Sequence, residues 1–283
     1  MKKISIVLVA AACLCCTACV SDMQEIAGDL VSVAKDELKN AAHGKTKQVP
    51  AYTNDEAVSA MKDALEEGIK FASTQLSKTD AYFKNEAIKI LLPPEAQPII
   101  NVLNKLPNGQ NLVDDVVLRL NRTAEEAAKD TVSIFTKAIK EMTVIDGIKI
   151  VTGNKNAATQ YLKEKCYDSL VKLYSPKINT VLDKPLVMNV SANKAWTTLV
   201  TTYNKYAPIP NQVAKLAGQK EPCPPVEVDL ASYATKKALD GLFLKIEEEE
   251  AKIRENPLKY ASDMIQKVFN YVKQGITTIT VKA

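Results

Sequence analysis

Apolar residues recur every three or four positions along most of this sequence, which is the spacing of amphipathic helices. The spacing is longest and most regular from about Asn111 to Met142, where small residues in the middle favour close approach by a neighbouring helix. We expect a long central helix here, although Thr123-Ala-Glu-Glu126 has the form of a capping box and would allow a break near Arg122. A second strongly periodic helix is predicted from Asp229 to Ile253.

Capping and breaking residues place the ends of further helices. A capping box, Thr53-Asn-Asp-Glu56, opens the domain, Asn154 or Asn156 caps a helix that ends at Pro176, and Pro257 begins the last helix, 258–274. The remaining segments are assigned as an extended run at 88–92, short helices at 99–103 and 146–153, a helix near 196–206, and a proline-rich surface loop with one helical turn at 207–228.

Together these elements predict an all-α fold, a single domain of about eight helices over residues 53–275. A tail follows at 276–283, whose residues favour a strand but have no evident partner, so it is expected to be frayed or weakly docked. Hydrophobic residues make up 46% of the chain and charged residues 25%, with only 9 glycines, which fits a globular helical protein rather than a disordered one.

The beginning of the chain has the pattern of an export signal. Two lysines precede an apolar run, Ile4–Ala12, that is too short to span a bilayer. Cys19 follows two small residues, as at a bacterial lipoprotein cleavage site, although Cys16 stands where leucine is usual. We expect residues 1–18 to be removed and Cys19 to carry a diacylglycerol and an amide-linked fatty acid such as palmitate. The alternative is an ordinary secretory signal that is cut nearby.

This signal predicts a protein of the bacterial cell envelope that is anchored to a membrane by its lipid. No aspartate directly follows Cys19, so the outer membrane, with the protein facing the periplasm, is the expected location. Residues 19–52 then form the lipidated N-terminus and a tether. Removal of Lys2 and Lys3 with the signal lowers the formal net charge from +4 to +2, so no nucleic-acid partner is expected.

Few residues of the mature chain could serve redox or metal chemistry. Cys166 and Cys223 remain beside Cys19, and in an exported protein they could form one disulfide or stay two unpaired thiols. The only histidine, His43, lies in the tether, so no histidine metal site and no cofactor are expected. The GxSxG, P-loop, HExxH and CxxC motifs are absent from the mature sequence.

Three phrases of the sequence point to a known family: NRTAEEA at 121–127, IFTKAIKEMTVIDGIKIVTGNKNAATQYL at 134–162, and ALDGLF…EEEEAKIRENP at 238–257. Through these phrases, which occur in matching order, the chain resembles exported bacterial proteins catalogued as domain-of-unknown-function family 4197 (DUF4197), over about residues 53–275. The resemblance implies a mostly helical envelope protein and implies no activity. The proline-rich 207–228 segment departs from the family pattern.

A set of polar residues at the predicted helix joints is the candidate site. Its members are Asn121, Arg122, Glu125, Asp146, Asn156, Asp240, Glu249 and Arg254. In a structural interpretation, arginine–carboxylate pairs and asparagine caps hold the helices together. In a functional interpretation, the set converges on a cleft between the long helix and the 229–255 helix, where Arg122 and Arg254 bind an anionic group. Glu249 or Glu250 extends the apolar face of its helix, so not all four glutamates of EEEE are solvated.

These observations favour a non-enzymatic envelope lipoprotein, either a scaffold for an envelope partner or a binder of a small ligand. One alternative is an envelope hydrolase that uses Glu125 or Glu249 as a general base. A further alternative is a carrier of an apolar molecule between alanine-rich helices, which would need a sizeable dry cavity.

Overall fold

The computed structural model describes residues 46–282, so the predicted signal peptide, Cys19 and His43 lie outside the described residues. Helices dominate the described part of the chain, and the predicted all-α class is confirmed. Two units are considered separately: a helical unit, Ala51–Thr277, and a pair of strands contributed by residues on either side of it.

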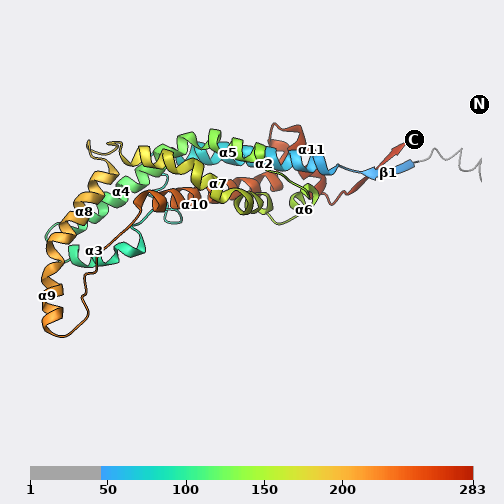
Figure 1. Ribbon diagram of the computed structural model, residues 1–283. Helices are drawn as coiled ribbons and strands as arrows, with labels where there is room; N and C mark the ends of the chain where they lie inside the picture. The colour runs from blue at the N-terminus through green and yellow to red at the C-terminus, as the bar shows by residue number, and fades with distance from the viewer. Residues whose placement is uncertain (1–45, 283) are drawn as a thin grey trace, which may run out of the picture. The chain divides into compact units, whose positions relative to one another are not determined.

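The strand pair joins the segment before the helical unit to the segment after it. β1 (Thr46–Pro50) and β2 (Thr278–Lys282) are antiparallel, with Val49 opposite Ile279 (Figure 1). The prediction of an unpartnered tail at 276–283 is therefore wrong. Its partner strand lies in the segment assigned to the tether, and no local signal in the sequence connects two segments so far apart.

The centre of the helical unit is α2 (Asn54–Leu76), which packs against α10 (Leu230–Glu255), α11 (Asp263–Lys273), α5 (Thr131–Glu141) and α6 (Gly147–Val151). The apolar stripe of α2 is fully buried, with Met61, Leu65 and Ile69 all at 0% exposure. The predicted capping box at its start is confirmed, because Thr53 Oγ1 accepts from the Glu56 amide at 3.2 Å and Glu56 accepts from the Thr53 amide at 2.8 Å.

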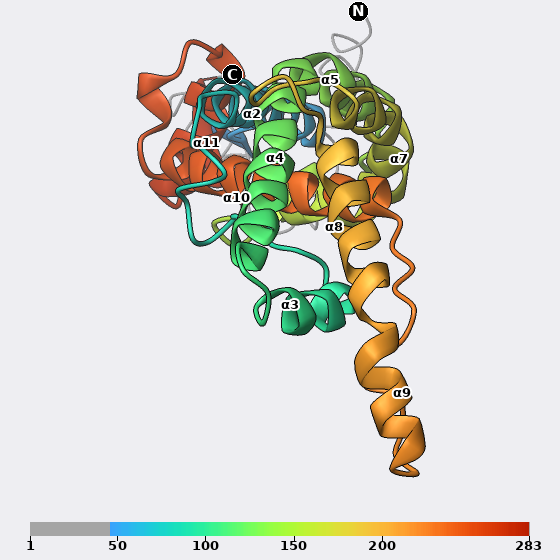
Figure 2. The same cartoon turned by 90° about the vertical axis from the view of Figure 1, so that its left-hand side faces the viewer.

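A second group of helices adjoins this centre. α7 (Ala157–Leu182) packs on α10 and α5, and α4 (Gly109–Ala127) packs on α8 (Ala192–Tyr206) and α7. α3 (Gln97–Leu103) contacts α8, which leads directly into α9 (Pro208–Leu216). Figures 1 and 2 both show α9 at the end of the helical unit that lies farthest from α2 and α11. Single 3₁₀ turns occupy Pro94–Ala96, Ala128–Asp130 and Pro257–Lys259.

The predicted long helix at 111–142 is divided at a different place from the one expected. The break is the 3₁₀ turn Ala128–Asp130, whereas Arg122 lies inside α4. Ser73 of α2 donates to the carbonyl of Ala128 at 2.8 Å, and Thr131 beyond the turn is fully buried. The position of the break thus depends on a contact with a distant helix, which the local capping pattern does not encode.

Three further boundaries differ from the predictions. α7 continues through Pro176 to Leu182, because Ile178, Val181 and Leu182 are fully buried. Burying those side chains contributes about 1.5–3 kcal/mol each, against a cost of about 3 kcal/mol for an internal proline. The last predicted helix, 258–274, is interrupted before Ser262, which caps α11 and donates to Asp63 of α2. The region 207–228 contains the nine-residue α9 rather than one turn.

Candidate functional site

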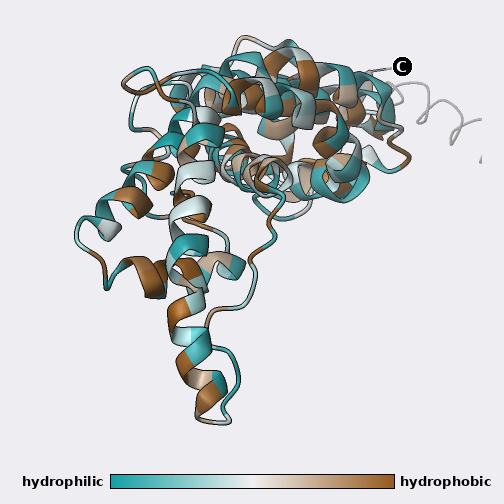
Figure 3. Cartoon of the chain, turned by 60° about the vertical axis from the view of Figure 1, so that its left-hand side comes forward, coloured by the Kyte–Doolittle hydropathy of each residue, from teal (hydrophilic) through white to brown (hydrophobic). Residues whose placement is uncertain are grey.

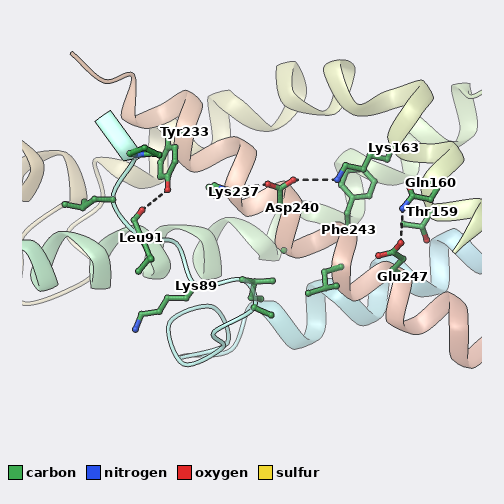
Figure 4. A pocket seen from close by; sticks show the side chains of 16 residues that line it. Lys89, Leu91, Thr159, Gln160, Lys163, Tyr233, Lys237, Asp240, Phe243 and Glu247 are labelled. Atoms are coloured by element: carbon green, nitrogen blue, oxygen red, sulfur yellow. Dashed lines mark hydrogen bonds and ion pairs between the residues drawn. The ribbon is translucent and has the colours of Figure 1, made fainter. Parts of the chain in front are cut away.

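An open groove with a volume of about 590 Å³ lies between α7, α10 and the segment 87–94 (Figure 4). Its apolar lining includes Ile88 and Leu92, each 8% exposed, and Phe243, which is 3% exposed. Leu91 also faces the groove and is 58% exposed. The groove therefore combines a partly apolar floor with polar walls and is open to solvent.

The 87–94 wall of the groove is held in place without regular secondary structure. Lys89–Pro93 forms neither helix nor strand. The Asn121 side chain of α4 accepts from the Ile90 amide at 2.9 Å and donates to the Ile90 carbonyl at 2.8 Å. Tyr233 of α10 donates its hydroxyl to the Leu91 carbonyl at 2.9 Å. Side chains from two helices thus satisfy peptide groups that a strand would satisfy in a sheet.

A close approach between a tyrosine and a glycine positions α10 beside this wall. Tyr82 is fully buried, and its hydroxyl donates to the carbonyl of Ala238 at 2.7 Å. A Cβ atom at Gly241 would lie 2.5 Å from Cε1 of Tyr82, so only glycine leaves room for the ring. Burial raises the pKa of the Tyr82 hydroxyl, which therefore stays protonated as a donor at neutral pH.

Charged side chains surround the apolar floor. Lys89, Lys163 and Lys237 supply three cations, while Asp240 and Glu247 supply two carboxylates. The Asp240 carboxylate lies 3.7 Å from Nζ of Lys163 and 3.9 Å from Nζ of Lys237. Figure 4 shows Lys163 and Asp240 facing each other, with Lys89 reaching out from the other wall. The groove thus carries more positive than negative groups.

The other end of the groove is polar and is closed by hydrogen bonds. Glu247 accepts from Nε2 of Gln160 at 2.9 Å and also from the Asn156 side chain. These bonds join α10 to the first turns of α7. The Glu247 carboxylate therefore accepts hydrogen bonds from two side-chain amides. Farther along the groove, Nζ of Lys163 lies 5.5 Å from the centroid of the Phe243 ring.

The structure places the predicted polar set at several separate helix joints. Arg122 pairs with Asp80 and with Glu125, at 2.6 Å in each case. The other oxygen of Glu125 accepts from the amides of Tyr82 and Phe83 at 3.1 and 3.3 Å. Hydrogen bonds from Lys84 and Arg122 lower the pKa of the Asp80 carboxyl. This joint fixes the turn after α2 against α4.

Arg254 belongs to a second joint, between α10, α6 and α7. It pairs with Glu250 at 2.7 Å and donates to the last carbonyls of α6, at Ile150 and Val151. Glu250 accepts from the amide of Thr159 at 2.7 Å and from that of the preceding residue at 3.0 Å, so a carboxylate of α10 caps the start of α7. Glu250, which is 1% exposed, is the glutamate of EEEE that lies deepest.

The remaining members of the set have local partners. Asp146 accepts from the Lys149 amide at 3.2 Å and caps α6. Glu249 accepts from the Tyr260 hydroxyl at 2.7 Å and pairs with Lys252 at 3.0 Å. Burial and the Glu249 carboxylate raise the pKa of Tyr260. Asn156 precedes α7 without capping it, because Glu250 accepts from the amides of the first turn, and the Asn156 side chain donates to Glu247 instead.

Of the predicted set, Asp240 is the member that lines the groove. The residues that sequence reasoning missed are Lys89, Lys163, Lys237 and Tyr82, while Glu250 was named as a glutamate on the apolar face but not as a member of the polar set. Lys237 and Asp240 are three residues apart, so they share one face of their helix. This spacing was the signal in the sequence for a charged surface on that helix. Lys163 and Lys89 line the groove because α7 and the 87–94 segment pack beside α10. The spacing of residues along the sequence does not reveal this packing.

Cys166 and Cys223 are both buried free thiols, so the possible disulfide is not formed. Burial raises the pKa of the Cys166 thiol. Cys223 is held by Asn211 of α9, whose side chain accepts from the Cys223 amide and donates to its carbonyl, at 2.9 Å each. The two cysteines lie in different surroundings. Cys166 lies on α7 and lines a hollow together with Met142, while Cys223 lies in the segment that follows α9.

Over residues 46–282, no group of three His, Cys, Asp or Glu side chains is arranged to hold a metal ion. The helices described there include none with the length and apolar character needed to cross a bilayer.

Comparison with known proteins gives one match. The model of a family described as "Protein of unknown function (DUF4197)" matches residues 51–270, a range that contains the groove and both polar joints. Neither a curated protein nor a solved structure matches the chain.

Proposed function

The chain belongs to the DUF4197 family, as its sequence phrases indicated, and we propose that it binds a small amphiphilic anion in the groove between α7 and α10. The family description carries no activity, so the proposal rests on the groove itself. Its ligand would place an acidic group among the lysines and an apolar body over Leu92 and Phe243.

The observation that carries this proposal is the difference between two kinds of ion pair. At the joints, Arg122 and Arg254 meet their carboxylates at 2.6–2.7 Å. In the groove, Asp240 lies 3.7–3.9 Å from its two lysines, and these side chains are 43–49% exposed. Exposed pairs of this kind contribute about 0–1 kcal/mol, so a ligand anion can replace Asp240 as the partner of the lysines at little cost.

The third lysine of the groove is still less engaged. Nζ of Lys89 lies 3.9 Å from Glu86, whose side chain is 87% exposed. Nζ of Lys89 also lies 4.9 Å from the centroid of the Phe83 ring, so its ammonium rests against an aromatic face beside the 87–94 wall. The three lysines supply donors for a carboxylate or phosphate from both walls.

The size and lining of the groove fit a small amphiphile. Its volume of about 590 Å³ lies within the usual range for ligand sites, about 300–1,000 Å³. The exposed side chain of Leu91, together with the small exposed parts of Ile88, Leu92 and Phe243, favours an apolar body. The groove is open to solvent on one side, which differs from the enclosed dry cavity that a carrier of a wholly apolar molecule would need.

The alternative of a hydrolase with Glu125 or Glu249 as general base has less support. Both oxygens of Glu125 and of Glu249 already accept from protein donors, Tyr82 and Arg122 in the first case and Tyr260 and Lys252 in the second. Neither glutamate lines the groove. A general base needs a free lone pair directed at its substrate.

We further propose that the mature protein begins at Cys19, carries lipid there, and faces the periplasm from the outer membrane. The lipoprotein pattern of the first residues supports this location. Intact mass spectrometry of protein extracted from membranes tests it: the N-terminal peptide should begin at Cys19 with a mass increase for acyl chains. An unmodified N-terminus at another residue contradicts it.

Calorimetric titration with a matched series of ten-carbon amphiphiles tests the ligand class. The protein is the mature chain from residue 19 with Cys19→Ser, so that no attached lipid competes. Decyl phosphate and decanoate should bind, decanol should bind about tenfold more weakly, and decyltrimethylammonium should bind weakest, because only the anions gain charge-assisted hydrogen bonds.

The double variant Lys163→Gln/Lys237→Gln should lower the affinity for decyl phosphate about tenfold or more. A matched control, Lys137→Gln/Lys172→Gln, removes the same charge from exposed positions on α5 and α7 that do not line the groove. Equal loss in both double variants, or equal binding of the anionic and cationic amphiphiles, contradicts the proposal.

A further inference from the structure

The helix α9 presents an exposed apolar stripe at the far end of the helical unit. Ile209, Val213 and Leu216 stand four and then three residues apart, so they share one face of the helix. Their exposed fractions are 62%, 63% and 90%. Figure 3 shows apolar segments, in brown, alternating with polar ones along this helix, the lowest in the view.

The opposite face of α9 is covered by the chain itself. Ala214 is 7% exposed, and Asn211 forms its two hydrogen bonds with Cys223 of the returning segment. Tyr203 of α8 donates to the carbonyl of Pro224 at 2.6 Å and fixes the same segment. These contacts hold Val213 and Leu216 outward, while Ile209 also borders a hollow of about 400 Å³ that is lined by α3 and the returning segment.

The charges around the stripe are predominantly positive. Between residues 205 and 221 the sequence has Lys205, Lys215 and Lys220 and a single acidic residue, Glu221, and all four are exposed. Apolar side chains on one face of a helix, with lysines at other positions of the same exposed segment, are the pattern of a helix that lies in the interface of an anionic membrane. Each lysine near such a surface adds about 1 kcal/mol of attraction.

The form of the tip also suits a membrane surface. Gly218 turns the chain with φ +66°, and a Cβ atom there would meet no other atom within 4 Å. Leu216 projects immediately before this turn. A fluid bilayer accepts projecting apolar side chains without a preformed pocket, whereas a folded partner would need a cavity of matching shape.

We propose that the tip formed by α9 and residues 217–221 inserts Ile209, Val213 and Leu216 into the surface of an anionic membrane, with its lysines among the lipid headgroups. This contact would be separate from the groove and from any lipid on Cys19. It would be a reversible interfacial contact, because α9 is nine residues long and cannot span a bilayer.

Flotation with lipid vesicles tests the proposal. The mature chain from residue 19 with Cys19→Ser is mixed with vesicles of phosphatidylcholine alone or with one quarter phosphatidylglycerol. It should float with the anionic vesicles, and Ile209→Asn/Val213→Asn/Leu216→Asn should reduce the bound fraction about tenfold or more. The control Ile145→Asn/Met188→Asn/Leu258→Asn, which changes three exposed apolar residues elsewhere, should float like the parent chain.

Two further measurements distinguish membrane binding by the stripe from binding of another partner, such as a second copy of the chain. Lys205→Gln/Lys215→Gln/Lys220→Gln should remove most of the preference for anionic vesicles. In a Trp196→Phe background, Val213→Trp should be quenched by brominated lipid chains, since the indole lies at the headgroup–acyl boundary. Unchanged flotation of the Asn variant, or no quenching, overturns the proposal. So does loss of self-association in sedimentation by the Asn variant without change in flotation, which assigns the stripe to a second copy of the chain.

Discussion

The side-chain amide of Asn121 pairs with both peptide groups of Ile90, accepting from its N–H at 2.9 Å and donating to its carbonyl at 2.8 Å. The same amide nitrogen also donates to the Val117 carbonyl at 2.7 Å. Asn121 therefore does for the 87–94 wall what a neighbouring strand does in a sheet. Asn121 belongs to the predicted polar set as a residue at a predicted helix joint, and in the structure it supports the wall of the groove from behind without lining the groove.

Asn121→Ala should lower the free energy of unfolding by about 2–4 kcal/mol, because it leaves two buried peptide groups of Ile90 without partners. Urea denaturation at pH 7 measures this. Asn104→Ala, at an exposed asparagine in α3's last turn, is the control and should change stability by about 0.5 kcal/mol or less. If the two variants are equally stable, Asn121 does not brace the wall.

Gly241→Ala should destabilise the protein by about 1–3 kcal/mol, because its Cβ atom would stand 2.5 Å from the Tyr82 ring. Thermal and urea unfolding of the single variants and of Gly241→Ala/Tyr82→Leu form a double-mutant cycle. The cost of Gly241→Ala should shrink when Tyr82 is already leucine, since the clash is gone. Strict additivity of the two changes would rule out this contact as the reason for glycine.

Arg254→Ala should cost about 3–5 kcal/mol, because it leaves the Glu250 carboxylate buried without its cation and two α6 carbonyls without donors. Hydrogen exchange should also speed up at the Ala158 and Thr159 amides, which Glu250 caps. Lys70→Ala, which breaks the exposed pair with Glu67, is the comparison and should cost about 0.5 kcal/mol or less. Similar losses in both variants would contradict a special role for the joint.

The Asp80 joint gives a pH-dependent prediction. Its carboxyl has a pKa lowered by Lys84 and Arg122, so the stabilisation is present above the unfolded-state pKa of about 3.9 and is lost as the pH falls through the folded pKa. Asp80→Asn, which tolerates the φ of +68° at this position, should be less stable than the parent at pH 7. The difference should shrink on acidification, and a difference that is constant down to about pH 3 contradicts the assignment.

Much of the fold could be predicted from the sequence where a local pattern and burial agree. The capping box at Thr53, the cap at Asp229 and the short helix after Asp146 are formed as expected. The errors occur where a distant contact decides. The break at Ala128 depends on Ser73, and the continuation through Pro176 depends on the buried end of α7.

The candidate site was harder to predict, because its residues come from three segments that only packing brings together. Arginines and carboxylates at conspicuous places, such as Arg122 and Arg254, are mutually paired and support helix joints. Lys163 and Lys237 stand at ordinary surface positions of their helices, and Lys89 lies on a segment without regular secondary structure. Their shared location follows from the extended 87–94 wall and its anchor on Asn121, which no periodicity describes.

Photoaffinity labelling with a decanoate analogue that carries a diazirine on its chain, followed by peptide mass spectrometry, tests directly whether the groove binds an amphiphilic anion. A ligand in the groove should give labelled peptides from residues 87–94 and 237–247, with labelling strongly reduced in Lys163→Gln/Lys237→Gln and competed by decyl phosphate. Labelling that is confined to α9, or that persists unchanged in the double variant, would show that the groove is not the binding site.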